Sequence, residues 1–308
     1  MAIAVVGSIN CDVIAYVERL PRPGETLVAS GYRLGLGGKG ANQAVAARRL
    51  GSSVDLIGRV GGDAFGRAVL DELRRFAVDT ALVAVDPEGA TGMAMIHVAA
   101  DGENTIAIVA GGNGALGAAD LEQGRAALLA AKVLLLQLEV PLAVGLAAAA
   151  TVRSHGGLVI LDPAPAPAGG LAPEALGAID ILTPNETETA ALTGALPRSA
   201  DDGIAAARAL RRRGAATAIV KLGARGVAFS SADGEGFVPP FKVETVDSVA
   251  AGDCFNGALA HALDQRADLA AAVRYAAAAG ALSTTRRGAA AAAPSADEVA
   301  RLLSGITL

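Results

Sequence analysis

The segment from Val246 to Gly257 combines small residues, a carboxylate and the start of a helical pattern. Residues 250–252 are Ala-Ala-Gly, and apolar side chains recur at helical spacing after them, so we expect a helix that begins near Asp253. The free N–H groups and the dipole of such a helix start attract an anion. Asp253 could accept a proton from a substrate hydroxyl while those N–H groups hold a transferring phosphoryl group. The alternative is that Asp253 only caps the helix.

Cys254 follows Asp253 in the first turn of the same predicted helix. A helix N-terminus favours the thiolate and lowers the pKa of the thiol, whereas burial against a neighbouring sheet raises it. The sequence leaves both outcomes open, and the first would make the protein sensitive to thiol reagents.

A glycine-rich stretch, Gly35-Leu36-Gly37-Gly38-Lys39-Gly40, matches the dinucleotide-binding pattern G-x-G-x-x-G. That pattern must close the first strand of a βαβ unit, whereas here it follows an irregular segment, so we reject a dehydrogenase site. A phosphate-binding P-loop is also rejected, because its first glycine and its Ser or Thr are missing. The stretch instead indicates the start of a helix over Ala41–Leu50, with Lys39 and Asn42 placed to meet a polar ligand.

Apolar runs alternate with helical patterns along most of the chain, which predicts an α/β fold with a doubly wound, mostly parallel sheet. The predicted strands are Ile3–Gly7, Asp55–Val60, Val133–Leu138, Leu158–Leu161, Ile179–Leu182 and Ala216–Val220. Polar residues follow the apolar runs at Asn10, Glu139, Asn185, Lys221 and Asp253. The carboxyl ends of parallel strands share one sheet edge, where ligands bind in open α/β sheets. This common edge favours an enzyme.

Two segments break the alternation, and we expect them to form a separate small β-sheet. Residues 13–35 hold proline, glycine and short apolar stretches, while Thr91–Val98 and Asn104–Val109 flank a hairpin turn. Just before the first segment, Asn10 and Asp12 lie on one face of a strand. They could grip the hydroxyls of a sugar, or they could be turn formers that close the strand.

The C-terminal part predicts a helix over Ala270–Ala281 and a final helix that ends at Leu303. Ser295 would cap that final helix, with Glu298 three residues on, as in a capping box. Between the two helices, Ala289–Ala293 is a low-complexity run that we expect to be a loop insertion.

The composition restricts the class of protein. The chain has 308 residues, 52% of them hydrophobic and 19% charged, which favours a folded core over disorder. A net charge of −5 gives no support for nucleic-acid binding, and no run reaches the roughly 18 apolar residues that span a membrane. Two cysteines are too few for a disulfide framework, and the three histidines show no metal-ligand spacing. The first residues indicate a strand and not a signal peptide, so we expect a cytoplasmic protein.

Residues 37–44, Gly-Gly-Lys-Gly-Ala-Asn-Gln-Ala, and the segment Val246–Gly257 resemble the two signatures of the ribokinase (phosphofructokinase B) family of carbohydrate kinases. Pro184–Glu188 and Leu222–Gly226 resemble the motifs between them, so the resemblance covers nearly the whole chain in the right order. It implies a ribokinase-like α/β core with a β-sheet lid that is also the interface of a homodimer. The core would comprise 1–12, 36–90 and 111–308, and the lid 13–35 and 91–110.

The resemblance further implies ATP-dependent phosphorylation of a sugar, with D-ribose and its 5-hydroxyl as the leading substrate, and with Mg²⁺ and a monovalent cation such as K⁺ as cofactors. Asp253 would be the base, and the amides of Ala250, Ala251 and Gly252 would form the anion hole. The implied sugar ligands are Asn10, Asp12, Gly38, Lys39, Asn42 and Glu139. The implied nucleotide ligands are Asn185, Lys221, Leu222, Gly223, Ala224, Arg225, Gly226, Gly252 and Ala277. Glu188 would help to organise Mg²⁺, and the monovalent-cation site would comprise Asp247, Val249, Ser283, Arg286, Gly288 and Ser295.

Three features depart from the family pattern. Ser248 replaces a threonine, Ala277 stands where histidine or asparagine is frequent beside the adenine, and the alanine run precedes Ser295. The second bears on selectivity for the nucleotide base and the third on the cation site. The alternative functions are a kinase for deoxyribose, another ketose or aldose, or a nucleoside, and a sugar sensor without catalysis.

Overall fold

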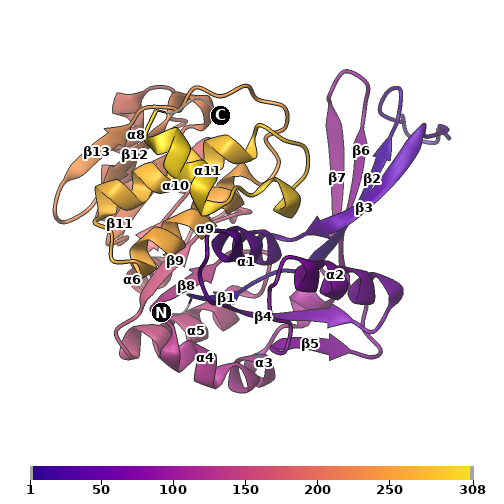
Figure 1. Cartoon of the computed structure of the whole chain (residues 1–308), viewed down its shortest axis with the longest axis horizontal. Helices are drawn as coiled ribbons and strands as arrows, with labels where there is room; N and C mark the ends of the chain where they lie inside the picture. Colours follow the sequence, from indigo (N-terminus) through magenta and orange to yellow (C-terminus); the bar gives the residue numbers. More distant parts are fainter. Residues whose placement is uncertain (1–2, 306–308) are drawn as a thin grey trace.

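The computed structural model describes residues 3–305, and Figure 1 shows a large α/β core from which a small β-sheet projects. The predicted fold class, a doubly wound and mostly parallel sheet, is confirmed. The core sheet has the strand order β13-β12-β11-β10-β9-β8-β1-β4-β5. Its strands are β1 (Ile3–Val6), β4 (Val54–Gly61), β5 (Val83–Asp86), β8 (Val133–Leu136), β9 (Leu158–Leu161), β10 (Ile181–Leu182), β11 (Thr217–Lys221), β12 (Val227–Ser230) and β13 (Glu235–Val238).

The order of the strands reverses in the middle of this sheet. β1 pairs in parallel with β4 on one side and with β8 on the other, and the chain then continues outward from both partners. Only β12 and β13, at one margin, run antiparallel to their neighbours among the core strands described. At such a reversal the loops that follow neighbouring strands diverge, and a crevice opens at the carboxyl edge of the sheet.

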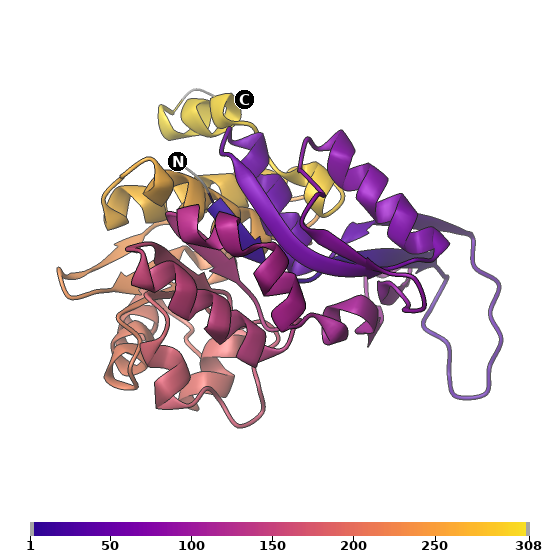
Figure 2. The same ribbon diagram turned by 90° about the horizontal axis from the view of Figure 1, so that it is seen from below.

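Two helix layers cover the two faces of the core sheet (Figure 2). Alternate residues of β1 belong to different hydrophobic clusters, with Ile3 and Val5 in one and Ala4 and Val6 in the other, as the period of a strand requires. The first layer contains α1 (Lys39–Arg49), α2 (Ala64–Arg75), α9 (Ala251–Asp264), α10 (Leu269–Ser283) and α11 (Ala296–Leu303). The second contains α3 (Ala118–Gln123), α4 (Arg125–Ala130), α5 (Leu142–Ser154), α6 (Pro173–Gly177), α7 (Glu186–Thr193) and α8 (Ala200–Arg212). Short 3₁₀ turns are η1 (Gly111–Ala115), η2 (Gly223–Arg225) and η3 (Ala290–Ala292).

The small sheet has the order β3-β2-β6-β7 and stands apart from the core in Figure 1. Its strands are β2 (Asn10–Tyr16), β3 (Gly31–Gly37), β6 (Gly92–Val98) and β7 (Asn104–Val109). The expected boundaries at residues 12 and 35 need correction. Asn10 already pairs with Gly37 and Gly92, so Asn10 and Asp12 open a strand of the small sheet and do not close a core strand.

The alanine run Ala289–Ala293 lies in the connection between α10 and α11, as expected of a loop, and three of its five residues are buried. Ala290, Ala292 and Ala293 are at most 3% exposed, and Ala293 packs with Ala46 and Cys254. The run therefore fills space beside α1 and α9. The predicted capping box of the last helix is confirmed, because the Ser295 side chain accepts from Glu298 N while the Glu298 carboxylate accepts from Ser295 N. Among residues 3–305, the helices are too short or too polar to cross a membrane.

Candidate active site

A cavity of about 720 Å³ opens at the carboxyl edge of the core sheet. Several elements far apart in the chain line it: Lys39 at the start of α1, Asp162 after β9, Asn185–Glu188 at the start of α7, Lys221 at the end of β11, Ala250–Asp253 at the start of α9 and Ala277 on α10. Three of the five polar residues expected at this edge, Asn185, Lys221 and Asp253, thus face one space. Asn10 and Glu139 are not part of the lining and bond instead to Asn113 and to Lys39 N, respectively.

The start of α9 leaves backbone N–H groups available to a ligand. The helix begins at Ala251, two residues earlier than expected, after Ala250 in the left-handed conformation (φ 58°) and without a side-chain cap. Of the three amides expected in the anion hole, that of Ala251 is engaged with Ser248 O at 3.3 Å. The N–H groups of Ala250 and Gly252, and that of Asp253, find no acceptor among the described residues. A Cβ atom placed on Gly252 would lie 3.3 Å from Lys221 Nζ, so an ammonium group stands beside the same turn. Together these donors suit a phosphoryl group.

The Asp253 carboxylate turns toward α1. Its Oδ2 accepts from Asn42 Nδ2 at 3.0 Å and its Oδ1 from Gln43 Nε2 at 3.1 Å, so the alternative that Asp253 merely caps α9 is wrong. Asp253 is 5% exposed, and burial is the main reason that its pKa rises to about 6. Lys39 and the two amides pull this pKa down, whereas the charge of Asp162 raises it. The group is therefore ionised at neutral pH and only about one pH unit from protonation, as suits a general base.

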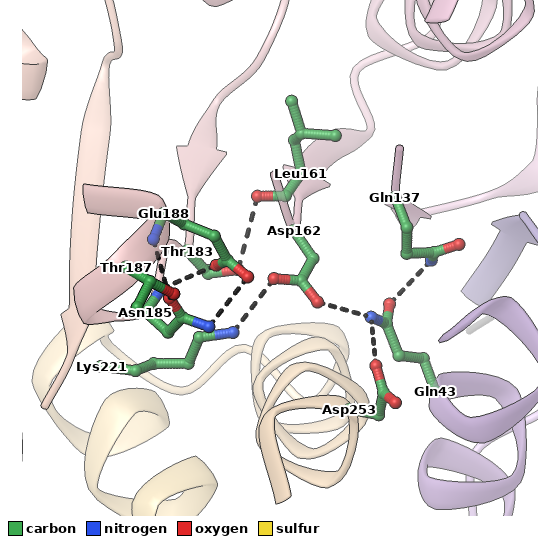
Figure 3. Close-up of polar contacts among 10 residues, drawn as sticks. All are labelled: Gln43, Gln137, Leu161, Asp162, Thr183, Asn185, Thr187, Glu188, Lys221 and Asp253. Atoms are coloured by element: carbon green, nitrogen blue, oxygen red, sulfur yellow. Dashed lines mark hydrogen bonds and ion pairs between the residues drawn. The ribbon is translucent and has the colours of Figure 1, made fainter. Parts of the chain in front are cut away.

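Two residues that sequence reasoning missed complete the surroundings of Asp253 (Figure 3). Gln43 also donates to Asp162 Oδ2, at 3.2 Å, and Asp162 Oδ1 accepts from Lys221 Nζ at 3.0 Å. The signal for Asp162 was present, because it follows the apolar run 158–161 just as Glu139 follows its own run. Gln43 directly follows Asn42, but its contacts span more than a hundred residues of sequence and have no local signature.

The expected sugar ligands gather where β1, the small sheet and α1 meet. Glu139 accepts from Ser8 Oγ at 2.6 Å and from Lys39 N at 3.1 Å. Asn10 Oδ1 accepts from Asn113 Nδ2 at 2.7 Å, so Asn113 and Ser8 are further polar residues that the sequence did not reveal. Gly38 lies between these groups with φ 87°, and a Cβ atom there would come within 2.7 Å of Asn10 N. Only glycine permits this close approach of backbones.

Charge is concentrated in this region. Burial, followed by repulsion from Glu139, raises the pKa of Asp12 to about 7, although Arg33 lowers it. Burial lowers the pKa of Lys39, but the attraction of four carboxylates outweighs it and leaves this pKa above its usual range; they are Asp253, Asp162, Glu139 and Glu188. Lys39 thus stays cationic in the middle of a cluster of acidic residues.

The residues expected at the nucleotide divide into two groups. Gly223, Ala224, Gly226 and Ala277 line the cavity. Leu222 is fully buried in the core, and the Arg225 guanidinium pairs with Glu186, so neither of these side chains is part of the lining. At the start of α7, Asn185 and Glu188 form a reciprocal capping box in addition to facing the cavity.

The residues matched to a monovalent-cation site lie in two loops that the structure joins, except Ser283, which is the last residue of α10. Asp247 accepts from Val249 N and from Gly288 N, both at 3.0 Å, and so ties the loop before α9 to the loop after α10. The remaining three are engaged elsewhere: Ser283 Oγ donates to Gly280 O, while Arg286 and Ser295 both bond to Glu298. Within residues 3–305 no group of three or more His, Cys, Asp or Glu side chains is placed to hold a metal ion.

Cys254 is not an activated thiol, which excludes the first of its two expected outcomes. The side chain is 1% exposed, and burial raises its pKa to about 12. A hydrogen bond with Ser283 pulls the other way but is weaker. Desolvation of a thiolate therefore outweighs the helix dipole at this position.

Comparisons with known proteins agree with this geometry. The model of the pfkB family carbohydrate kinases matches residues 2–296. The chain is 38% identical over 301 residues to a ribokinase of Haemophilus influenzae, with 98% of each chain covered, and 38% identical over 304 residues to a deoxyribokinase of Salmonella typhi, with 99% of each covered. Among solved structures, Arabidopsis thaliana ribokinase complexed with ribose and ATP superposes with a TM-score of 0.87 at 33% identity, over 98% of both chains.

Proposed function

Because the chain belongs to the pfkB family of carbohydrate kinases, we propose that it transfers the terminal phosphoryl group of ATP to the 5-hydroxyl of D-ribose, giving ribose 5-phosphate and ADP. The observation that carries this proposal is the position of Asp253. Its carboxylate accepts from Asn42 and Gln43 on α1, next to the expected sugar ligands Lys39 and Asn42, while Gly252 in the same helix turn lines the cavity beside Lys221. A sugar on one side and a triphosphate on the other would meet at this residue.

The chemistry follows from these positions. As the sugar oxygen attacks the γ-phosphorus, the new O–P bond forms, the bond to ADP breaks and the hydroxyl proton moves to Asp253. Negative charge on the transferring group is held by the N–H groups of Gly252 and Asp253 and by Lys221. Phosphoryl transfer needs position and charge stabilisation more than covalent help, and the site supplies both.

The residues near β2 suit a polyhydroxylated ligand. Asp12, Asn10 and Glu139 offer oxygen acceptors, while Lys39 and Asn42 offer donors, so adjacent hydroxyls could be bound in pairs. The small sheet would act as a lid that excludes water and limits the hydrolysis of ATP.

We also propose that Mg²⁺ accompanies the nucleotide. Burial, followed by repulsion from Asp162, raises the pKa of Glu188, which marks a surplus of negative charge beside the cavity despite Lys221. A divalent cation would relieve that surplus, and Glu188 would hold it through water. When bound, the ion would neutralise part of the negative charge on the phosphates.

A monovalent cation, K⁺ in our proposal, would bind where Asp247 joins the two loops that flank α9 and α10. There it would set the geometry of residues 250–252 without touching the substrate. At fixed ionic strength we expect K⁺ to activate more than Na⁺. Equal rates in K⁺, Na⁺ and a bulky organic cation would rule out this part of the proposal.

We further propose a cytoplasmic homodimer that forms through the lid. Both cysteines are free thiols, which suits a reducing compartment. The small sheet exposes large apolar side chains, among them Tyr32 at 76%, Ile106 at 56% and Ile108 at 58%. Such a patch is typical of a protein interface. Light scattering on the purified protein tests this, and a monomer at micromolar concentration would contradict it.

The substrate is tested by ADP release across a panel of pentoses, hexoses and nucleosides. We expect the highest kcat/KM with D-ribose. Deoxyribose is the second candidate, because the deoxyribokinase relative is as similar to this chain as the ribokinase relative. A preference for a nucleoside or a hexose would overturn the proposed substrate, and ligand binding without ADP release would favour a sensor.

A further inference from the structure

The side-chain amide of Gln43 connects two carboxylates, Asp162 and Asp253, that line the cavity (Figure 3). Gln43 Nε2 lies 3.1 Å from Asp253 Oδ1 and 3.2 Å from Asp162 Oδ2. Gln43 is fully buried, Asp162 is 3% exposed and Asp253 is 5% exposed. Hydrogen bonds to ionised groups are the strong ones, and their worth increases away from water. Gln43 therefore restrains both carboxylates.

A second amide determines which end of Gln43 faces the carboxylates. Gln137 Nε2 donates to Gln43 Oε1 at 2.8 Å. With its oxygen engaged there, Gln43 directs its NH₂ group at Asp253 and Asp162. A flipped amide would instead place its oxygen against two carboxylates, which repel it.

Asp162 has one further partner, and that partner stands beside the phosphate end of the cavity. Lys221 Nζ lies 3.0 Å from Asp162 Oδ1, with the lysine side chain 12% exposed. The same ammonium group lies beside Gly252 in the turn that would hold phosphate. A bound nucleotide would compete with Asp162 for this lysine.

We propose that Gln43 and Asp162 are positioning residues for the base: Gln43 holds the Asp253 carboxylate toward the sugar hydroxyl and favours its ionised form, and Asp162 opposes that ionisation, more strongly once phosphates attract Lys221. The nucleotide would thereby strengthen the base at the moment when it is needed. This inference rests on the proposed kinase function.

The charges around Asp253 give the two residues opposite effects. Burial raises the pKa of Asp253 to about 6, Lys39 lowers it, Asp162 raises it, and hydrogen bonds from Asn42 and Gln43 lower it. Glu139 and Asp12 lie further along the same acidic cluster. Loss of the Gln43 amide should therefore raise the pKa of Asp253, and loss of the Asp162 charge should lower it.

The experiment measures the pH dependence of kcat at saturating sugar and nucleotide for Gln43→Met and Asp162→Asn. For Gln43→Met we expect kcat to fall about 10- to 100-fold, the range for a lost hydrogen bond to a charged group, and the acidic limb of the profile to move to higher pH than in the wild type. For Asp162→Asn we expect the limb to move to lower pH. Gln137→Met, which loosens Gln43 without removing it, should move the limb upward by less.

A carbon-13 NMR titration of the Asp253 carboxyl in the free protein measures how each variant changes the pKa of Asp253, and it does not depend on turnover. If wild type phosphorylates no sugar but the carboxyl shifts remain opposite, the proposed function fails and the roles of Gln43 and Asp162 stand. The inference is overturned if Gln43→Met and Asp162→Asn move the titration in the same direction, or if neither moves it. Should Gln43→Met not fold, Gln137→Met and Asp162→Asn still have to shift in opposite directions.

Discussion

Helices α7 and α9 begin at the same edge of the core sheet, line the same cavity and carry an acidic residue at the third helical position, Glu188 and Asp253. In α7 the acid serves its own helix. Glu188 accepts from Asn185 N at 2.7 Å, and the Asn185 side chain accepts from Glu188 N at 2.9 Å. The reciprocal bonds satisfy donors that would otherwise be orphaned.

In α9 the acidic residue, Asp253, does not cap its own helix and bonds to residues of α1. Ala250 has no side chain that could cap, and Asp253 bonds to Asn42 and Gln43 on another helix. The N–H groups of Gly252 and Asp253 are left for a ligand. A helix start can therefore bind and react with a ligand when no local side chain caps it and residues from another helix hold its acidic side chain.

We expect the largest effect on kcat from substitution of Asp253, the acidic residue that does not cap its own helix. Asp253→Asn keeps the shape of the side chain but cannot take a proton, so kcat should fall by at least about 10²-fold, the lower range for a lost general base. Binding of the sugar, measured by calorimetry, should persist because the other hydroxyl ligands remain. If Asp253→Asn turns over near the wild-type rate, Asp253 is not the base, and the proposed difference in role between the acids of α9 and α7 is wrong.

The pH profile separates the base from the sugar site. Asp253 must be ionised to act, so kcat should be constant above the pKa that Asp253 has in the enzyme–substrate complex and fall about tenfold per unit below it. That pKa is about 6 in the free protein, and bound phosphates would raise it. Asp12, whose pKa is about 7, should be the better acceptor for sugar hydroxyls when ionised, so the KM for sugar should rise as the pH falls through 7.

Asp12→Asn is the control for that profile. It should abolish the dependence of KM near pH 7 and leave the acidic limb of kcat where it is in the wild type. If the kcat limb disappears as well, it does not belong to Asp253.

A smaller effect is expected where the acid caps its own helix. Asn185→Ala removes the acceptor for Glu188 N and should lower the free energy of unfolding by about 1 kcal/mol, as measured by urea denaturation. Asn185→Ser restores a capping oxygen and should recover most of the loss. Equal losses in both variants would mean that the cap is not what Asn185 contributes to stability.

The smallest expected effect is on the free energy of unfolding, from glycine substitutions at the start of α9. Ala250 has φ 58°, a conformation that costs an L-residue about 1–2 kcal/mol and glycine almost nothing. After the greater entropy of glycine in the unfolded chain is subtracted, Ala250→Gly should raise the free energy of unfolding by roughly 0.5–1 kcal/mol. At the next position, inside the helix, Ala251→Gly should lower it by a similar amount. The same sign at both positions would contradict the conformation of this turn.

The features that the sequence determined alone are those whose partners lie within a few residues. The alternation of apolar runs, such as Ile3–Gly7, with helical patterns predicted the α/β core, and the Ser295–Glu298 capping box followed from a spacing of three. Helix periods and caps are local physics, so they can be seen in a single chain. The resemblance of Val246–Gly257 to a family signature singled out Asp253 in the same way.

What Asp253 does was decided by the tertiary structure. Its amide donor Gln43 is 210 residues away in sequence, and Gln43 meets Asp162 across 119 residues. Such contacts depend on which strands become neighbours in the sheet, and on burial, which moved the pKa of Asp253 and of Cys254 upward. Desolvation depends on all the atoms packed around a group, so it cannot be deduced from the neighbouring residues in the sequence.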